Sequence, residues 1–168
     1  MTCTIVTNGE ELLLKCKNEG EEPYISIKMP MRYRIWELYC KGYDTFYLNC
    51  EYGVPMWAAQ FICALKLYNN ITLNIVIPYY FQFYNWTDEY RHIYFDLNCR
   101  ADSSVTPNLR YHEKSYDYTD EFMIDRSDLL LVFGKPEDKL HAVDYAKRRG
   151  IEIEYYPLDY SVKGSFSN

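Results

Sequence analysis

Residues 129–133 read Leu-Leu-Leu-Val-Phe, an apolar run without a single polar side chain. A strand that faces water on one side alternates apolar and polar residues, whereas a strand covered on both faces is apolar throughout. This run therefore predicts a central strand of a parallel sheet. Residues 72–77, Thr-Leu-Asn-Ile-Val-Ile, predict a second strand, which Pro78 ends because proline lacks the N–H that a sheet needs.

Helical patterns alternate with strand patterns along the rest of the chain. We predict helices over 31–41, 54–68, 88–99, 117–125 and 139–149, and further strands over 3–7, 45–48 and 151–155. This alternation is typical of α/β proteins and predicts a mostly parallel sheet of about five strands. Residues 11–28 fit either two more strands or an irregular segment, and residues 103–108 have the composition of a loop.

Length and composition narrow the expected class. A chain of 168 residues fits one domain, expected over 1–162 with a tail over 163–168, and residues 1–30 are the least clearly assigned part. The chain has no apolar run of the roughly 20 residues that cross a bilayer and no basic, apolar leader at its start, so we expect a soluble, cytoplasmic protein.

The charge and the spacing of the cysteines and histidines argue against binding to nucleic acids, membranes and metal ions. The formal net charge is −6, and no stripe of Lys and Arg offsets it, so we expect neither nucleic acid nor membrane as a partner. The six cysteines are scattered, and His92, His112 and His141 have no partners at metal-binding spacing, so we expect no metal. The 19 tyrosines fit half-buried strands or a contact surface.

In a parallel sheet, the loops that follow the strands meet at one edge, and helix N-termini point at whatever binds there. The predicted strands select four such loops, namely Asn8-Gly9, 49–53, 78–86 and 134–139. The second loop leads into a helix whose first amide groups favour an anion. We therefore place the candidate ligand site at this edge.

One of these loops carries a family resemblance. Residues 49–60, Asn-Cys-Glu-Tyr-Gly-Val-Pro-Met-Trp-Ala-Ala-Gln, resemble the strand-to-helix motif of YpsA-like proteins, usually Ser-Gly-x-x-Gly-Val-Glu-x-Trp-Ala-Ala-Glu. These proteins belong to the SLOG superfamily, which also contains LOG-type phosphoribohydrolases and DprA. The likeness extends through 75–79, Gln82, Trp86 and 122–131, and covers roughly 31–160. It implies a Rossmann-like three-layer sandwich and a nucleotide or ADP-ribose-like ligand.

The sequence also departs from the family pattern. Cys50 replaces a glycine, Pro55 replaces the motif glutamate, Glu137-Asp138-Lys139 replaces a Gly-Gly-Thr phosphate loop, and Thr119-Asp120 replaces an Arg-Asn pair. A side chain at position 50 would stand where backbone should approach a phosphate, and two acidic residues would repel one. LOG-type hydrolysis or transfer should fail without these groups.

Two functions remain, and the first is preferred. The first is a non-catalytic domain that binds a nucleotide-derived small molecule, and the second is a ligand-free interaction or scaffold protein, which would include a homodimer. An active N-glycosidase or phosphoribohydrolase is the least favoured. Trp57 with Trp86 fits an aromatic wall for a planar ring or plain helix packing, and Asp125 with Ser127 and Asp128 fits a ligand contact or an ordinary turn. The expected ligand-binding residues are Asn8, Gly9, Asn49, Cys50, Glu51, Gly53, Trp57, Pro78, Tyr79, Trp86 and Asp125.

Overall fold

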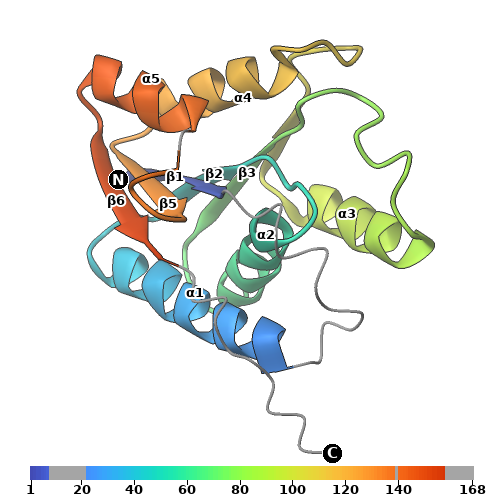
Figure 1. The fold of residues 1–168 in the computed structure, drawn as a ribbon. Helices are drawn as coiled ribbons and strands as arrows, with labels where there is room; N and C mark the ends of the chain where they lie inside the picture. The colour runs from blue at the N-terminus through green and yellow to red at the C-terminus, as the bar shows by residue number, and fades with distance from the viewer. Residues whose placement is uncertain (8–21, 139, 158–168) are drawn as a thin grey trace, which may run out of the picture.

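The computed structural model describes residues 1–7, 22–138 and 140–157 (Figure 1). Its strands are β1 (Thr2–Thr7), β2 (Thr45–Leu48), β3 (Thr72–Val76), β4 (Ser103–Val105), β5 (Leu129–Phe133) and β6 (Glu152–Tyr156). Its helices are α1 (Glu22–Cys40), α2 (Val54–Leu65), α3 (Asp88–Arg100), α4 (Ser115–Ile124) and α5 (His141–Arg149). Strands and helices alternate along the chain, as the sequence predicts.

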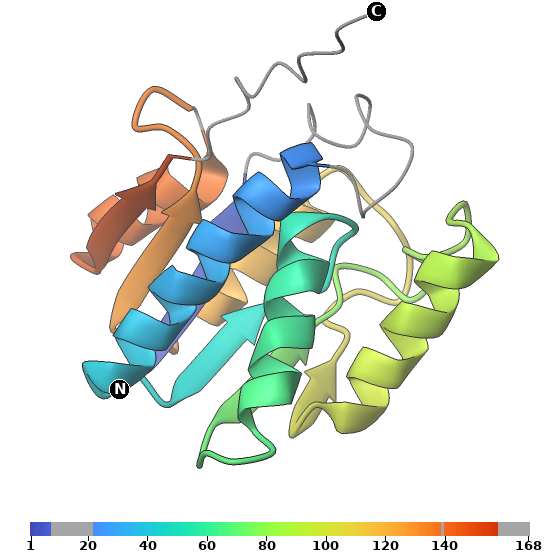
Figure 2. The same ribbon diagram turned by 90° about the horizontal axis from the view of Figure 1, so that it is seen from below.

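The six strands form one sheet in the order β4-β3-β2-β1-β5-β6, and every neighbouring pair is parallel. The chain moves outward from β1 to β4 and then returns to place β5 on the other side of β1. Helices α1, α2 and α3 cover one face of the sheet, and α4 and α5 cover the other (Figures 1 and 2). The predicted three-layer α/β sandwich with a parallel sheet is therefore confirmed.

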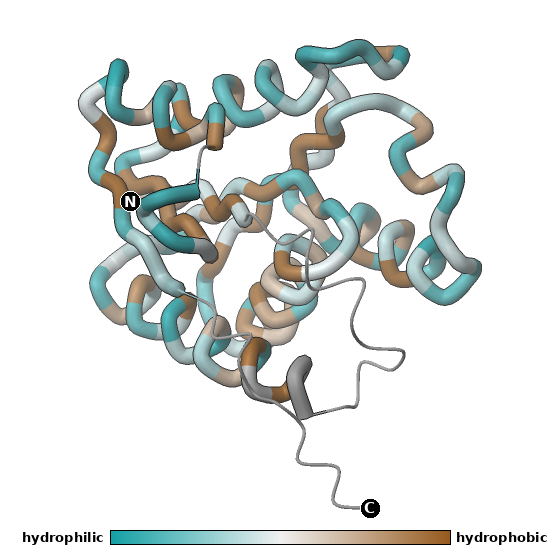
Figure 3. The backbone as a smooth tube through the Cα atoms, in the orientation of Figure 1, coloured by the Kyte–Doolittle hydropathy of each residue, from teal (hydrophilic) through white to brown (hydrophobic). Residues whose placement is uncertain are grey.

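Burial explains why the strands occupy these places. All five side chains of β5 are buried, because β5 lies inside the sheet and is covered on both faces. Hydropathy mapped on the backbone shows the apolar residues concentrated in the strands and on the inner sides of the helices (Figure 3). One core lies under α1, α2 and α3, and a smaller one lies under α4 and α5.

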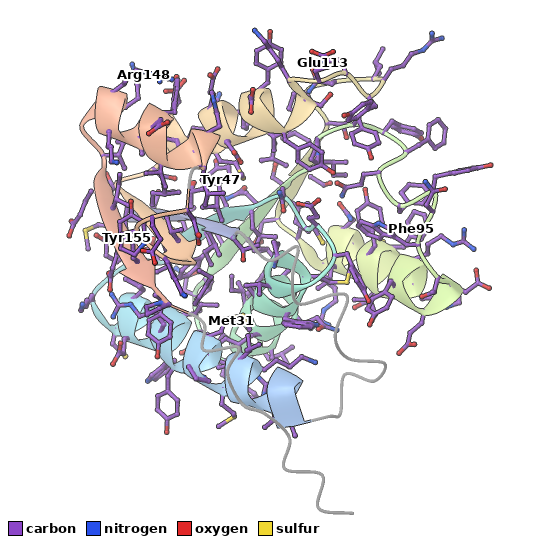
Figure 4. The ribbon with its side chains drawn as sticks, in the orientation of Figure 1. Met31, Tyr47, Phe95, Glu113, Arg148 and Tyr155 are labelled. Atoms are coloured by element: carbon purple, nitrogen blue, oxygen red, sulfur yellow. The ribbon has the colours of Figure 1, made fainter. Side chains whose placement is uncertain are left out.

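Helix α1 begins earlier than the sequence predicts and contains Pro30. The reason is tertiary packing, because Ile27 and Met31 lie one turn apart and are both buried in the larger core. Figure 4 shows Met31 on the inner side of this helix. Residues 11–28, which fit strands or an irregular segment by sequence, fall partly outside the described residues, and the described part from Glu22 is helical.

The sheet has one more strand than expected. Residues 103–105 form the edge strand β4, although their composition indicates a loop. Asp102 fixes this strand to β3, because its carboxylate accepts a hydrogen bond from the backbone N–H of Leu73 at 2.7 Å. The same carboxylate forms an ion pair with Lys66. The strand therefore forms through long-range contacts and not through its own apolar content. None of the described helices combines the length and the apolarity that crossing a membrane requires.

Candidate functional site

The carboxyl ends of the strands converge at one edge, and the order of the strands reverses between β1 and β5. Ligands of open α/β sheets bind outside the carboxyl edge at such a reversal, where two neighbouring loops diverge. The loops after β2 and β3 and residues 134–138 after β5 are described at this edge, together with the start of α4. The loop after β1, with the predicted ligand residues Asn8 and Gly9, lies outside the described residues.

The turn between β2 and α2 has an unusual backbone. Cys50 adopts a φ of 50°, and it is the only non-glycine with positive φ among the described residues. Its side chain is fully buried in the larger core, so only its backbone is available at the ligand edge. Burial raises the pKa of its thiol. The Cβ of Cys50 therefore points away from the ligand edge, contrary to the reasoning from the sequence that it would obstruct a phosphate.

Gly53 completes this turn with φ 99° and ψ −132°, a conformation that side chains exclude. The side-chain oxygen of Asn49 accepts the N–H of Glu51 at 3.0 Å, which fixes the first half of the turn. The resulting turn holds Glu51 above the end of β2 and starts α2 directly afterwards.

The start of α2 offers few amide groups to a ligand. Pro55 has no N–H, Met56 donates to the carbonyl of Glu51 at 3.1 Å, and Trp57 donates to that of Gly53 at 3.0 Å. The expected attraction of anions to these amides is therefore reduced, because Pro55 lacks an N–H and the N–H of Met56 is already used.

The loop after β3 forms the neighbouring wall of the edge. Asn108 donates to the carbonyl of Pro78 at 3.0 Å, which ties this loop to the segment after β4. Gln82 is 5% exposed and donates to the carbonyl of Asn49 at 3.4 Å, so it joins the loops after β3 and β2. Pro78, Tyr79 and Asn49 are thus brought to the same part of the edge.

Helix α4 contributes two residues that complete this wall. Burial raises the pKa of the Tyr116 hydroxyl, and the neighbouring carboxylate of Glu51 and the side chain of Tyr79 are smaller causes. The rings of Tyr79 and Tyr116 lie 6.2 Å apart. Three separate segments, the loops after β2 and β3 and the start of α4, therefore meet at Tyr116.

Asp120 lies one turn further along α4 and is half-buried. Burial, with the negative charges of Asp117 and Glu51 as smaller causes, raises the pKa of this carboxyl to about 8. Glu121 on the same helix instead bonds His141, with 3.0 Å between Oε1 and Nε2. Within the described part of the chain Asp120 has no hydrogen bond. A carboxyl with a raised pKa in such a position is typical of functional sites.

The two tryptophans that the sequence singles out have different surroundings. Trp57 is 3% exposed and packs in the larger core, with the ammonium group of Lys28 lying 4.8 Å from its ring centre. Trp86 lies against Tyr52 and Tyr94 at ring distances of 6.3 and 5.6 Å. Trp86 and Tyr52 line a shallow cavity of about 200 Å³ beside the edge. The geometry of Trp57 matches helix packing.

Asp125 is not brought to this edge. It follows α4 immediately before β5, so it lies at the amino end of that strand. Its carboxylate pairs with Arg149 at 2.9 Å and accepts the hydroxyl of Tyr145 at 3.0 Å. Asp128, close by, accepts the N–H of Thr2 at 2.8 Å. These contacts are those of a structural turn between α4 and β5.

The loop after β5 holds a carboxylate of its own. Asp138 accepts the N–H of Lys135 at 2.8 Å, and its own N–H donates back to the carbonyl of Lys135 at 3.0 Å. The N–H of Gly134 donates to Tyr156 at 3.1 Å. The loop is thus closed by internal bonds at the place where the family resemblance implies a phosphate.

Sequence reasoning missed Tyr116 and noted Asp120 only as a departure from the family pattern. Their spacing of four residues places them on one side of a helix. A long segment separates β4 from this helix, however, so neighbouring residues do not reveal that the start of α4 lies at the ligand edge. The described residues contain no group of three His, Cys, Asp or Glu side chains arranged to hold a metal ion.

Comparison with known proteins agrees with this arrangement. A UPF0398 protein of Bacillus cereus (strain AH187) is 26% identical over 136 residues, covering 77% of this chain and 73% of that protein. A UPF0398 protein of Macrococcus caseolyticus (strain JCSC5402) is 22% identical over 168 residues, covering 95% of this chain and 92% of that protein. DNA processing protein A from Helicobacter pylori, in a structure that concerns its single-stranded DNA binding mode, has a similar fold, with a TM-score of 0.61 and 12% identity over 96% of this chain and 67% of that chain.

The family model named YpsA, described as the YspA SLOG family, matches residues 11–158. This range contains both the β2–α2 turn and the α4–β5 segment that carry the resemblance. The chain therefore belongs to the YpsA family of SLOG proteins.

Proposed function

We propose that this chain is a small-molecule-binding domain that holds a nucleotide-derived ligand at the carboxyl edge of its sheet and does not turn it over. The observation that supports this most is the meeting of Glu51, Tyr79, Tyr116 and Asp120, which come from three separate segments. Polar groups that converge from distant parts of a chain at the carboxyl edge of a parallel sheet are the usual form of a ligand site.

The chemistry of these groups fits hydroxyl and amino groups of a ligand. Glu51 supplies carboxylate acceptors, while Tyr116 and a protonated Asp120 can both donate and accept. The nearby aromatic rings of Tyr79 and Tyr111, 5.2 Å apart, offer apolar surface for a planar base. The absence of turnover follows from Pro55, which stands in place of the family's motif glutamate.

The test is a thermal-shift screen with nucleobases, nucleosides, AMP, cyclic nucleotides, NAD and ADP-ribose. A ligand present at about 100 times its Kd should stabilise the fold by about 2.7 kcal/mol. The response should fall at least fivefold in Tyr116→Phe and Glu51→Gln. The matched control is Glu152→Gln, which removes the same charge at the opposite end of the sheet, where Glu152 is exposed. No shift with any compound would overturn the proposal.

A second function is favoured by one surface. The outer side of α1 exposes Ile25 (46%), Met29 (46%), Tyr33 (66%) and Trp36 (41%) in a continuous stripe. An exposed stripe of large apolar side chains favours a protein contact. This observation supports the alternative of an interaction protein that pairs with a second copy of itself.

Light scattering distinguishes this alternative from the first proposal. A dimer at micromolar concentration that Tyr33→Glu converts to a monomer, without a response to any ligand in the screen, would favour the interaction protein. Tyr84→Glu is the control, because Tyr84 is 72% exposed and lies outside α1. A monomer at all concentrations would exclude the homodimer.

A further inference from the structure

We propose that the ligand of this edge carries no phosphate at the loops after β2 and β5, and that the domain therefore prefers a nucleoside or free base to the corresponding monophosphate. This inference rests on the proposed function, since it specifies the ligand of the same site. It is carried by the hydrogen bonds of the two loops.

Phosphate binding in α/β folds depends on backbone N–H groups that point into the edge without an internal partner. In the turn after β2, the N–H of Glu51 is bonded to Asn49, that of Met56 to Glu51, and Pro55 has none. A phosphate that drew on the amides of Glu51 and Met56 would have to break these bonds, and each break leaves a donor or acceptor without its partner.

The loop after β5 excludes a phosphate more directly. The carboxylate of Asp138 already accepts the N–H of Lys135 at 2.8 Å, so an anion of the protein itself occupies a donor of this loop. Asp144 adds a second negative charge to the first turn of α5. The carboxylates of Asp138 and Asp144 therefore already satisfy the positive end of this loop and helix, and a phosphate brought there would meet like charge.

The side chains between these two loops add to the same preference. Glu51 and Asp120 lie close enough for the charge of Glu51 to raise the pKa of Asp120. A phosphate beside them would face repulsion, whereas ribose hydroxyls or a base amino group would donate hydrogen bonds to the carboxylate. The same groups thus disfavour the phosphate and favour the neutral part of a nucleotide.

Calorimetric titration with paired ligands tests the inference. Adenosine is compared with AMP, and guanosine, cytidine and uridine with their monophosphates, so that each pair differs by one phosphate. We expect at least one nucleoside to bind about tenfold or more tightly than its monophosphate. The preference should shrink at least threefold in Asp138→Asn and Glu51→Gln and stay unchanged in Glu152→Gln.

The outcomes separate this inference from the proposed function. A monophosphate that binds as tightly as its nucleoside, or more tightly, overturns the phosphate exclusion and leaves the proposed site standing. Absence of binding by every nucleoside, base and phosphate overturns both. A preference for nucleosides that both Asp138→Asn and Glu51→Gln retain in full would also overturn the inference, because it would place the discrimination elsewhere. Folding of each variant is checked by its melting temperature without ligand.

Discussion

The hydroxyl oxygens of Thr4 and Ser127 lie 2.7 Å apart in the buried space between β1 and the turn before β5. Ser127 also donates to the carbonyl of Met123 at 3.0 Å, so the hydrogen of the Thr4 hydroxyl is left to bridge the two side chains. This contact ties the end of α4 to the central strand. It gives Ser127 a structural role, which is one of the two interpretations that the sequence leaves open.

Ser127→Ala should destabilise the fold by about 1–3 kcal/mol, because it leaves the fully buried hydroxyl of Thr4 without a partner. Adding Thr4→Val should recover part of the loss, since both polar groups are then gone. Urea unfolding of the wild type, both single variants and the double variant measures the coupling. Strict additivity of the two single effects would show that the hydroxyls do not interact.

Gly53→Ala should cost about 1–3 kcal/mol and weaken ligand binding, because φ 99° with ψ −132° is closed to residues with a Cβ. The control is Gly150→Ala. Gly150 has φ 70° and ψ 24°, and a Cβ there would meet no atom within 4 Å, so the cost should be smaller. Equal costs in thermal or urea unfolding would contradict the strain assigned to the β2–α2 turn.

The stability should fall as the pH rises from about 4 to about 8, through the ionisation of Asp120. The folded state raises the pKa of this carboxyl to about 8, so it keeps a proton that the unfolded chain releases near its ordinary value of 3.8. Below that value the two states bind the same proton and the effect vanishes. Asp120→Asn removes this slope.

The difference in unfolding free energy between Asp120→Asn and the wild type, measured at pH 4.5 and pH 8.5, checks this prediction. We expect the asparagine variant to gain several kcal/mol relative to the wild type at the higher pH, because each pH unit between the two pKa values costs the wild type about 1.4 kcal/mol. Asp96→Asn is the control, because Asp96 has 62% of its side chain exposed and belongs to a surface pair. A pH-independent difference for Asp120→Asn would mean that Asp120 ionises normally.

Glu154→Gln should destabilise the fold by about 1–3 kcal/mol, because it leaves a buried guanidinium without one of its two carboxylates. Arg34 is 6% exposed and joins α1 to β6 through Glu154, and it also pairs with Glu37 at 2.7 Å. Glu37→Gln is the matched control. Glu37 has 57% of its side chain exposed, so its loss should cost no more than about 1 kcal/mol. Similar losses in chemical unfolding would contradict this assignment.

The chain should release no free base from nucleoside monophosphates. The site does contain carboxyl groups, but Pro55 stands in place of the motif glutamate that the family carries. Chromatographic detection of the base over several hours with micromolar protein is the measurement. Release that Glu51→Gln or Asp120→Asn abolishes, and that Glu152→Gln leaves intact, would show an active site. The proposal of binding without turnover would then be wrong.

Several features of the edge follow from local sequence. The apolar run 129–133 predicts the buried strand β5, and Pro78 marks the end of the strand pattern that begins at Thr72. Gly53 predicts a backbone turn, and Pro55 predicts the first turn of α2. These signals are local because apolar side chains, the freedom of glycine to adopt positive φ and the missing N–H of proline are properties of the residues themselves.

Other features needed contacts from far along the chain. β4 forms because its backbone pairs with β3, and α1 begins at Glu22 because Ile27 is buried against the sheet. Position 50 accommodates a non-glycine residue with positive φ because the side chain of Cys50 enters the core. None of these outcomes could be judged from neighbouring residues, because packing energy came from elements distant in sequence.

The sequence by itself determined that parallel strands would end at a common edge, because the alternation of apolar runs and helical patterns leaves few other arrangements. Only the tertiary structure decided which groups meet there. It brought Tyr116 and Asp120 of α4 to Glu51, and it placed Asp125 at the other end of the sheet. The reason is that a helix places its two ends at opposite edges of the sheet, so one segment supplies both a site residue and a structural turn.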